Sequence, residues 1–95
     1  MQKTKIIATI GPSCNNKQTI KTMLLKGLNV VRINMSHNAD ISAIKKTVNM
    51  IRTQAKQTKT SVSIMMDLGG PKIRVKLLPK TSNLTIIKNK KYHII

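Results

Sequence analysis

The chain has 95 residues, enough for one small domain with a modest hydrophobic core. Lysine and arginine number 18 against two acidic residues, which gives a formal net charge of +16, and Tyr92 is the only aromatic residue. A basic chain suggests an anionic partner such as nucleic acid, but RNA-binding surfaces usually need aromatic side chains on which bases stack. The single cysteine, Cys14, excludes a disulfide framework and a zinc cluster built from cysteines.

The sequence offers no targeting or membrane signal. Its first residues lack the apolar core of a signal peptide, and no apolar run approaches the length of a membrane span. One unpaired cysteine suits a reducing compartment. We therefore expect a cytoplasmic protein with no membrane partner.

The first predicted unit is a strand followed by a helix. Residues 6–10 form a nearly continuous apolar run, which is typical of a parallel strand buried on both faces, and residues 11–12 end it. Asn15, with Gln18 three residues later, predicts a capping box. Apolar residues then recur at helical spacing until Gly27, the predicted C-cap.

The second unit repeats this order. A strand is predicted at about residues 29–34, and a polar loop then leads to a helix that Asp40 is expected to cap. The apolar stripe of this helix consists of Ile44, Val48, Ile51 and Ala55. Its lysines and Arg52 lie off the stripe and are expected to form a solvated face.

A third strand is predicted before Asp67, because Val62, Ile64 and Met66 alternate with their neighbours. The resulting β-α-β-α-β order predicts an α/β fold with a parallel sheet, either a barrel or a doubly wound sheet. Beyond Pro71, short β-like runs at residues 73–78, 84–87 and 92–95 are predicted to be pieces of antiparallel hairpins.

The second strand carries polar side chains on one of its sides. Successive strand residues point to opposite faces, so Arg32, Asn34 and Ser36 share one face. A guanidinium beside amide and hydroxyl oxygens suits an anionic ligand with a nearby hard cation. Taken alone, the alternation also fits an ordinary half-solvated strand.

Three motifs strengthen the first interpretation. Residues 4–12 read T-K-I-x-x-T-I-G-P, residues 32–37 read R-x-N-x-S-H, and residues 67–74 read D-x-x-G-P-x-I-R. In this order and spacing they resemble the N-terminal part of pyruvate kinase, over about residues 3–78. The resemblance implies that residues 1–70 are the N-terminal part of a (β/α)8 TIM barrel, with its first three strands and two helices. Residues 71–95 would be the incomplete start of an inserted β-barrel lid domain.

The resemblance also implies an activity and its ligands. Pyruvate kinase is the glycolytic phosphotransferase that moves phosphate from phosphoenolpyruvate to ADP, giving pyruvate and ATP, with K⁺ and Mg²⁺ as cofactors. Arg32 would bind the substrate, and the full-length parent would be a homotetramer. Nucleotide-binding positions would be Asn34, Ser36, His37 and Arg74, and K⁺ ligands would be Asn34, Ser36, Asp67 and the backbone carbonyl of Leu68.

The chain departs from the family pattern at Leu68, Gly69 and Lys72, where the family commonly has Thr, Lys and Glu. The change at Lys72 reverses a charge near the lid junction, so the contacts there are open. The family's catalytic lysine and the acidic Mg²⁺ ligands would lie in later strands, so no catalytic residue is assigned here. Because a complete barrel needs about 250 residues, we expect a fragment that is inactive alone.

The sequence permits two other interpretations. The alternative function is a small basic nucleic-acid-binding protein, although nucleic acid is not the expected partner, because the lysines are scattered and aromatic residues nearly absent. A small doubly wound phosphate-binding domain would need a G-x-G-x-x-G turn after the first strand. Residues 10–13 contain one glycine, so this interpretation ranks last.

Overall fold

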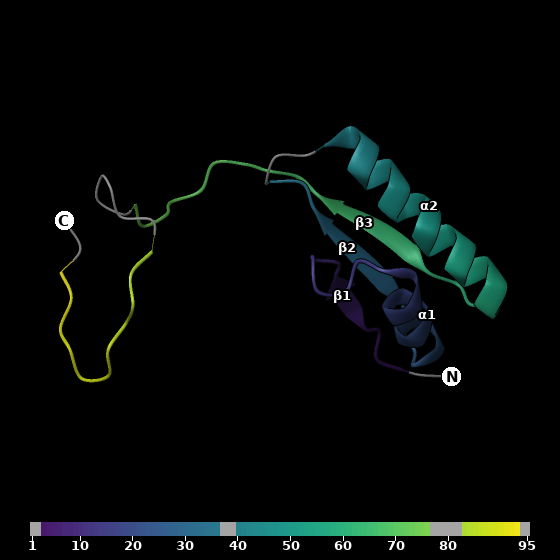
Figure 1. The fold of residues 1–95 in the computed structure, drawn as a ribbon, viewed down its shortest axis with the longest axis horizontal. Helices are drawn as coiled ribbons and strands as arrows, with labels where there is room; N and C mark the ends of the chain where they lie inside the picture. The colour runs from purple at the N-terminus through teal and green to yellow at the C-terminus, as the bar shows by residue number, and fades with distance from the viewer. Residues whose placement is uncertain (1–2, 37–39, 77–82, 94–95) are drawn as a thin grey trace.

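The computed structural model describes residues 3–36, 40–76 and 83–93. Its elements follow the order β1 (Ile7–Thr9), α1 (Lys17–Leu25), β2 (Val30–Asn34), α2 (Ile41–Thr58) and β3 (Ser63–Asp67). The strands form one parallel sheet in the order β1-β2-β3 (Figure 1). The predicted α/β class and β-α-β-α-β order are confirmed.

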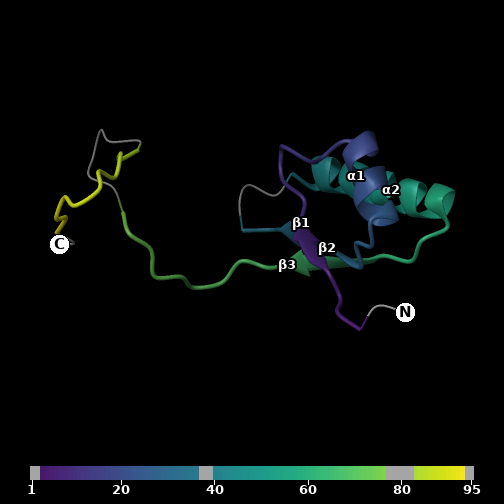
Figure 2. The ribbon, with the colours of Figure 1, turned by 90° about the horizontal axis from the view of Figure 1, so that it is seen from below.

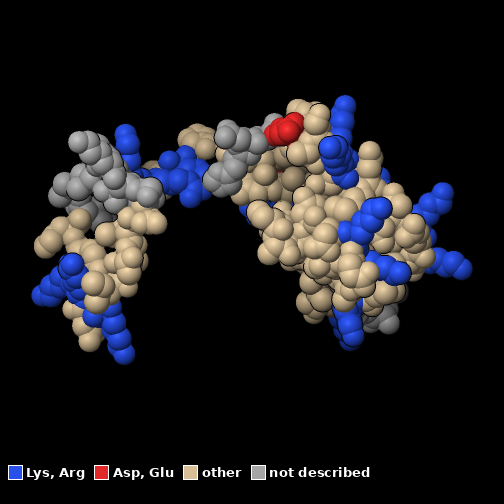
Figure 3. All heavy atoms as spheres, in the orientation of Figure 1, with Lys and Arg blue, Asp and Glu red and all other residues tan. Residues whose placement is uncertain are grey.

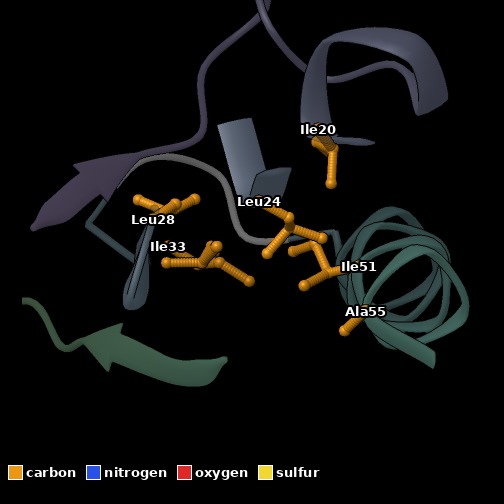
Figure 4. Packing of buried hydrophobic residues seen from close by; sticks show 7 residues of the cluster. Ile20, Leu24, Leu28, Ile33, Ile51 and Ala55 are labelled. Atoms are coloured by element: carbon orange, nitrogen blue, oxygen red, sulfur yellow. The ribbon is translucent and has the colours of Figure 1, made fainter. Parts of the chain in front are cut away.

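Both helices pack on the same face of the sheet (Figure 2). The central strand turns Val31 and Ile33 toward them, and these side chains are buried together with Ile20, Leu24 and Ile51 from the helices (Figure 4). Val31, Ile20 and Ile51 have no exposed surface. The core is therefore a single aliphatic layer between the sheet and the helices.

The opposite face of the sheet is not covered by any helix or strand among the described residues (Figure 2). The prediction that the first strand is buried on both faces is therefore wrong: Ile6 is 45% exposed and Ile7 is 56% exposed. The apolar run reflects a strand suited to two covered faces, but only one face has a packing layer in this part of the chain.

Helix α1 begins one residue later than the capping pattern predicted. Asn16, not Asn15, is the N-cap, and its side-chain oxygen accepts the backbone N–H of Thr19 at 2.9 Å. Asn15 instead donates from Nδ2 to the hydroxyl of Thr47 on α2, at 3.1 Å. The side chain predicted to cap α1 therefore joins the loop before α1 to α2 instead.

The other predicted helix ends are confirmed. Gly27 follows the last turn of α1 with φ 106°, and the N–H of Leu28 donates back to the carbonyl of Met23 at 3.0 Å. This arrangement is typical of a Schellman C-cap, which favours glycine at that position. Asp40 is the N-cap of α2, accepting the N–H of Ser42 at 2.9 Å.

Helix α2 has the predicted two-sided character. Ile51 and Ala55 of the apolar stripe are buried, Ile44 and Val48 are half-buried, and the lysines and Arg52 are exposed. Lysine and arginine side chains are spread over the visible surface and do not gather in one patch (Figure 3). In the described part of the chain, no helix is long and apolar enough to cross a membrane.

The predicted β-like runs after Pro71 do not form strands in residues 73–76, 84–87 or 92–93. The remaining positions of these runs, 77–78 and 94–95, lie outside the described residues. Within the described residues 83–93 the chain makes a turn, in which the N–H of Lys90 donates to the carbonyl of Ile87 at 3.2 Å. An isolated hairpin is marginally stable at best, so β propensity alone does not produce a sheet here.

Candidate phosphate and cation site

The candidate site lies at the carboxyl edge of the sheet, on its uncovered face. Strand register places Thr9 beside Arg32 and places Asn34 beside Asp67. Because Val31 and Ile33 turn toward the helices, the alternating Arg32 and Asn34 turn to the other face. The three strands therefore bring together polar side chains that are far apart in the sequence.

Arg32 is held between its two neighbouring strands. Its Nε donates to Oδ2 of Asp67 on β3 at 2.9 Å, and Nη2 forms an ion pair with the same oxygen. On the other side, Nη1 donates to Oγ1 of Thr9 on β1 at 2.9 Å. The side chains of Arg32 and Asp67 are 31% and 42% exposed, so water weakens the ion pair and its main effect is to orient the guanidinium.

A cluster of oxygen atoms lies next to this guanidinium. Oδ1 of Asn34 accepts both the N–H of Ser36 at 3.0 Å and its hydroxyl at 2.5 Å. The N–H of Met35 donates to the backbone carbonyl of Asp67 at 2.9 Å. A Cβ on Gly69 would lie 3.6 Å from Cα of Ser36. The segments that follow β2 and β3 therefore run against each other and bring Asn34, Ser36 and Asp67 together.

This donor set fits a monovalent cation better than a divalent one. Asn34 and Ser36 contribute neutral oxygens, Asp67 contributes one negative charge, and hard cations prefer such ligands. Both contacts from Arg32 go to Oδ2 of Asp67, so Oδ1 is the carboxylate oxygen that a cation could reach. The described residues contain no group of three histidine, cysteine or acidic side chains that could hold a metal ion.

The remaining predicted site residues are placed differently. Leu68 is 74% exposed, and because its side chain is a hydrocarbon only its backbone carbonyl could serve as a ligand. Arg74 is exposed in a segment without helix or strand, and among the described residues it makes no hydrogen bond to the oxygen cluster. His37 lies outside the described residues. The structure thus brings together Arg32, Asn34, Ser36 and Asp67 but not Arg74.

Thr9 is the site residue that the sequence analysis missed. It closes the short strand β1 and is the register partner of Arg32. A signal was present in the sequence, because Thr9 is the second threonine of the T-K-I-x-x-T-I-G-P motif. Only the pairing of β1 with β2 shows which side chain it meets.

Comparison with known proteins identifies the family. A model of the pyruvate kinase barrel domain matches residues 1–95. The chain belongs to the pyruvate kinase family. It is 43% identical over 89 residues to a pyruvate kinase of Thermococcus litoralis, covering 94% of this chain and 18% of that relative.

Solved pyruvate kinase structures agree in fold. A crystal structure of pyruvate kinase from Cryptosporidium parvum matches with a TM-score of 0.67 and 47% identity, covering 73% of this chain and 14% of that one. A complex of Cryptosporidium parvum pyruvate kinase with ADP matches with a TM-score of 0.68 and 44% identity, covering 75% of this chain and 14% of that one. The three parallel strands and two helices are thus part of a pyruvate kinase barrel domain, and the chain spans less than a fifth of these relatives.

Proposed function

We propose that this chain provides the phosphoryl- and cation-binding corner of a pyruvate kinase, which transfers a phosphoryl group from phosphoenolpyruvate to ADP and yields pyruvate and ATP. The observation that carries the proposal is the position of Arg32 at the carboxyl edge of a parallel sheet, beside the oxygens of Asn34, Ser36 and Asp67. Enzymes with barrels of parallel strands place their active sites at this edge. An arginine fork is suited to two oxygens of one phosphoryl group.

In this proposal Arg32 holds the phosphoryl group in place while it is transferred. Phosphoryl transfer depends mainly on positioning and on electrostatic stabilisation of the spreading negative charge. Asn34, Ser36, Asp67 and the carbonyl of Leu68 would hold K⁺, which supplies positive charge beside the phosphoryl group. Asp67 also orients the Arg32 guanidinium by accepting its Nε–H.

Nucleotide binding is assigned to Asn34, Ser36, His37 and Arg74. Support for a nucleotide ligand comes from the similar Cryptosporidium parvum pyruvate kinase in complex with ADP. We assign residues 71–95 to the start of the lid domain, which would have to bring the exposed Arg74 toward the sheet edge. The whole enzyme is proposed to be a cytoplasmic homotetramer.

The residues of this chain do not fit Mg²⁺. The chain has two acidic residues, and Asp40 caps α2, so no pair of carboxylates is available to the ion. No step is therefore assigned to Mg²⁺, whose ligands would lie outside this chain. For the same reason we propose that the 95 residues alone are inactive.

The test places residues 1–76 in a complete barrel, by exchanging them for the matching segment of the Thermococcus litoralis pyruvate kinase. Arg32→Lys keeps the charge but removes the planar fork, so turnover should fall by about 100-fold or more. Arg52→Lys is the matched control, because Arg52 is exposed on α2. Ser36→Ala should raise the K⁺ concentration needed for half-maximal rate. The proposal is wrong if Arg32→Lys is as active as Arg52→Lys and Ser36→Ala leaves the K⁺ midpoint unchanged.

A further inference from the structure

The guanidinium of Arg32 is fixed at two separate points. Asp67 contacts Nε and Nη2, but both contacts converge on the single oxygen Oδ2. A planar group held at one oxygen can still pivot about that oxygen. Thr9 contacts the third nitrogen, Nη1, at 2.9 Å from the opposite strand, and this second point prevents the pivot.

These contacts leave a usable pair of donors. A guanidinium has five N–H groups, one on Nε and two on each terminal nitrogen. The contacts with Asp67 and Thr9 engage one N–H on Nε, one on Nη2 and one on Nη1. One N–H therefore remains on each terminal nitrogen, so two donors on different nitrogens are left for the oxygens of a phosphoryl group.

Thr9 is suited to this role by its chemistry and its position. A β-branched side chain in a strand has few accessible rotamers, so the strand backbone fixes the place of the hydroxyl. Register pairs Thr9 with Arg32, and this pairing sets the distance between the two side chains. We infer that Thr9 is a positioning residue that orients Arg32 for the phosphoryl group of the substrate, an inference that rests on the function proposed above.

The first test reads Arg32 directly in the 95-residue chain, without ligand. The Nε–H signal of Arg32 is identified in ¹H–¹⁵N NMR spectra by its loss in Arg32→Lys. Thr9→Val removes the hydroxyl at nearly constant shape. The chemical shift of the Arg32 Nε–H signal should therefore change, and its relaxation should report a less ordered guanidinium. Thr9→Ser keeps the hydroxyl and should restore the signal. Thr53→Val, an exposed change on α2, is the matched control. An unchanged Arg32 signal in Thr9→Val overturns the inference.

The second test uses the exchanged complete enzyme described above. Thr9→Val should raise KM for phosphoenolpyruvate or lower kcat by about tenfold, because a small misplacement of a binding group is costly. KM for ADP should change less, and Thr9→Ser should recover most of the loss. A purely structural role would instead change both KM values together and lower the urea midpoint.

The two proposals fail in different ways. If Arg32→Lys retains full turnover, the proposed function is wrong and the role of Thr9 in phosphoryl binding falls with it. If Arg32→Lys is inactive but Thr9→Val matches Thr53→Val in every kinetic constant, the site stands and only the inference about Thr9 is overturned.

Discussion

The carboxylate of Asp67 has two cationic partners in this proposal, Arg32 and K⁺. Its Oδ2 is the acceptor for Arg32, while the proposed K⁺ site needs a carboxylate oxygen from the same side chain. The carboxylate can serve both only if Arg32 and K⁺ use different oxygens. Because the pair is partly exposed, its contribution to folding should be small and its contribution to the site large.

Replacing Asp67 separates these contributions. Asp67→Asn should lower the free energy of unfolding of the 95-residue chain by at most about 1 kcal/mol, as expected for a solvent-exposed ion pair, measured by urea unfolding. In the exchanged complete enzyme, the K⁺ midpoint should rise by about tenfold or more, because the only negative ligand is lost. Asp40→Asn is the matched control, since asparagine caps helices as well as aspartate. A loss above about 3 kcal/mol, as for a buried pair, or an unchanged K⁺ midpoint would contradict this assignment.

At the level of elements, the connection from the end of α1 to β2 helps to set the register between β1 and β2. Gly27 ends α1 with a positive φ, and the chain enters β2 three residues later. In the same short connection, the side-chain oxygen of Asn29 accepts the N–H of Ile6, and the carbonyl of Ile6 accepts the N–H of Asn29 at 3.1 Å. The turn at Gly27 therefore delivers β2 to its partner β1 in the register that pairs Thr9 with Arg32.

Changing Gly27 should weaken this unit. Gly27→Ala places a side chain at φ 106°, which L-residues rarely adopt, so we expect the free energy of unfolding to fall by about 1–2 kcal/mol. Gly11→Ala is the control, because a Cβ there would meet nothing within 4 Å. Its stability should stay the same or rise slightly, as alanine restricts the unfolded chain. Urea unfolding followed by circular dichroism measures both variants, and equal stabilities would show that the Gly27 conformation costs nothing.

At the scale of the whole molecule, charge and the uncovered sheet face stand out. The net charge is +16, and the cationic side chains are spread over the visible surface (Figure 3). A scattered distribution gives general repulsion within the folded chain and not the focused field of a nucleic-acid site. The uncovered face of the sheet exposes Ile7 and Met65 next to Arg32, so apolar and site residues share one surface.

Salt should therefore stabilise the fold. Raising NaCl from about 20 mM to about 200 mM shortens the screening length, and we expect the melting temperature to rise by about 4–8 °C, which corresponds to about 1 kcal/mol. Differential scanning fluorimetry measures the shift. A variant carrying Lys45→Glu and Lys56→Glu on the exposed side of α2 should respond less, because its repulsion is smaller.

The same salt series tests the nucleic-acid alternative. A protein that neutralises several phosphates loses about 1000-fold or more in affinity over this range of salt. Binding to duplex DNA by fluorescence anisotropy should be weak at 200 mM NaCl. Tight binding at that salt, or a melting temperature that falls with salt, would contradict the view that these charges form a solvated surface.

The sequence by itself determined features that depend on near neighbours. Alternation placed Arg32, Asn34 and Ser36 on one face, and local capping signals placed Asp40 and Gly27 at the helix ends. The three motifs determined the family, which the barrel-domain match confirms. Propensity, capping and periodicity act over a few residues, so they can be recognised without knowing how the chain packs.

The tertiary structure decided which distant residues meet. Arg32 reaches Asp67, 35 residues away, and Thr9, 23 residues away, because strand register aligns them, and no local pattern encodes that register. Packing of α2 against the loop before α1 likewise engages Asn15 with Thr47, 32 positions along the chain, while Asn16 caps α1. Packing also decided that Ile7 is exposed, because burial depends on a second layer over the sheet and not on the apolar character of the strand.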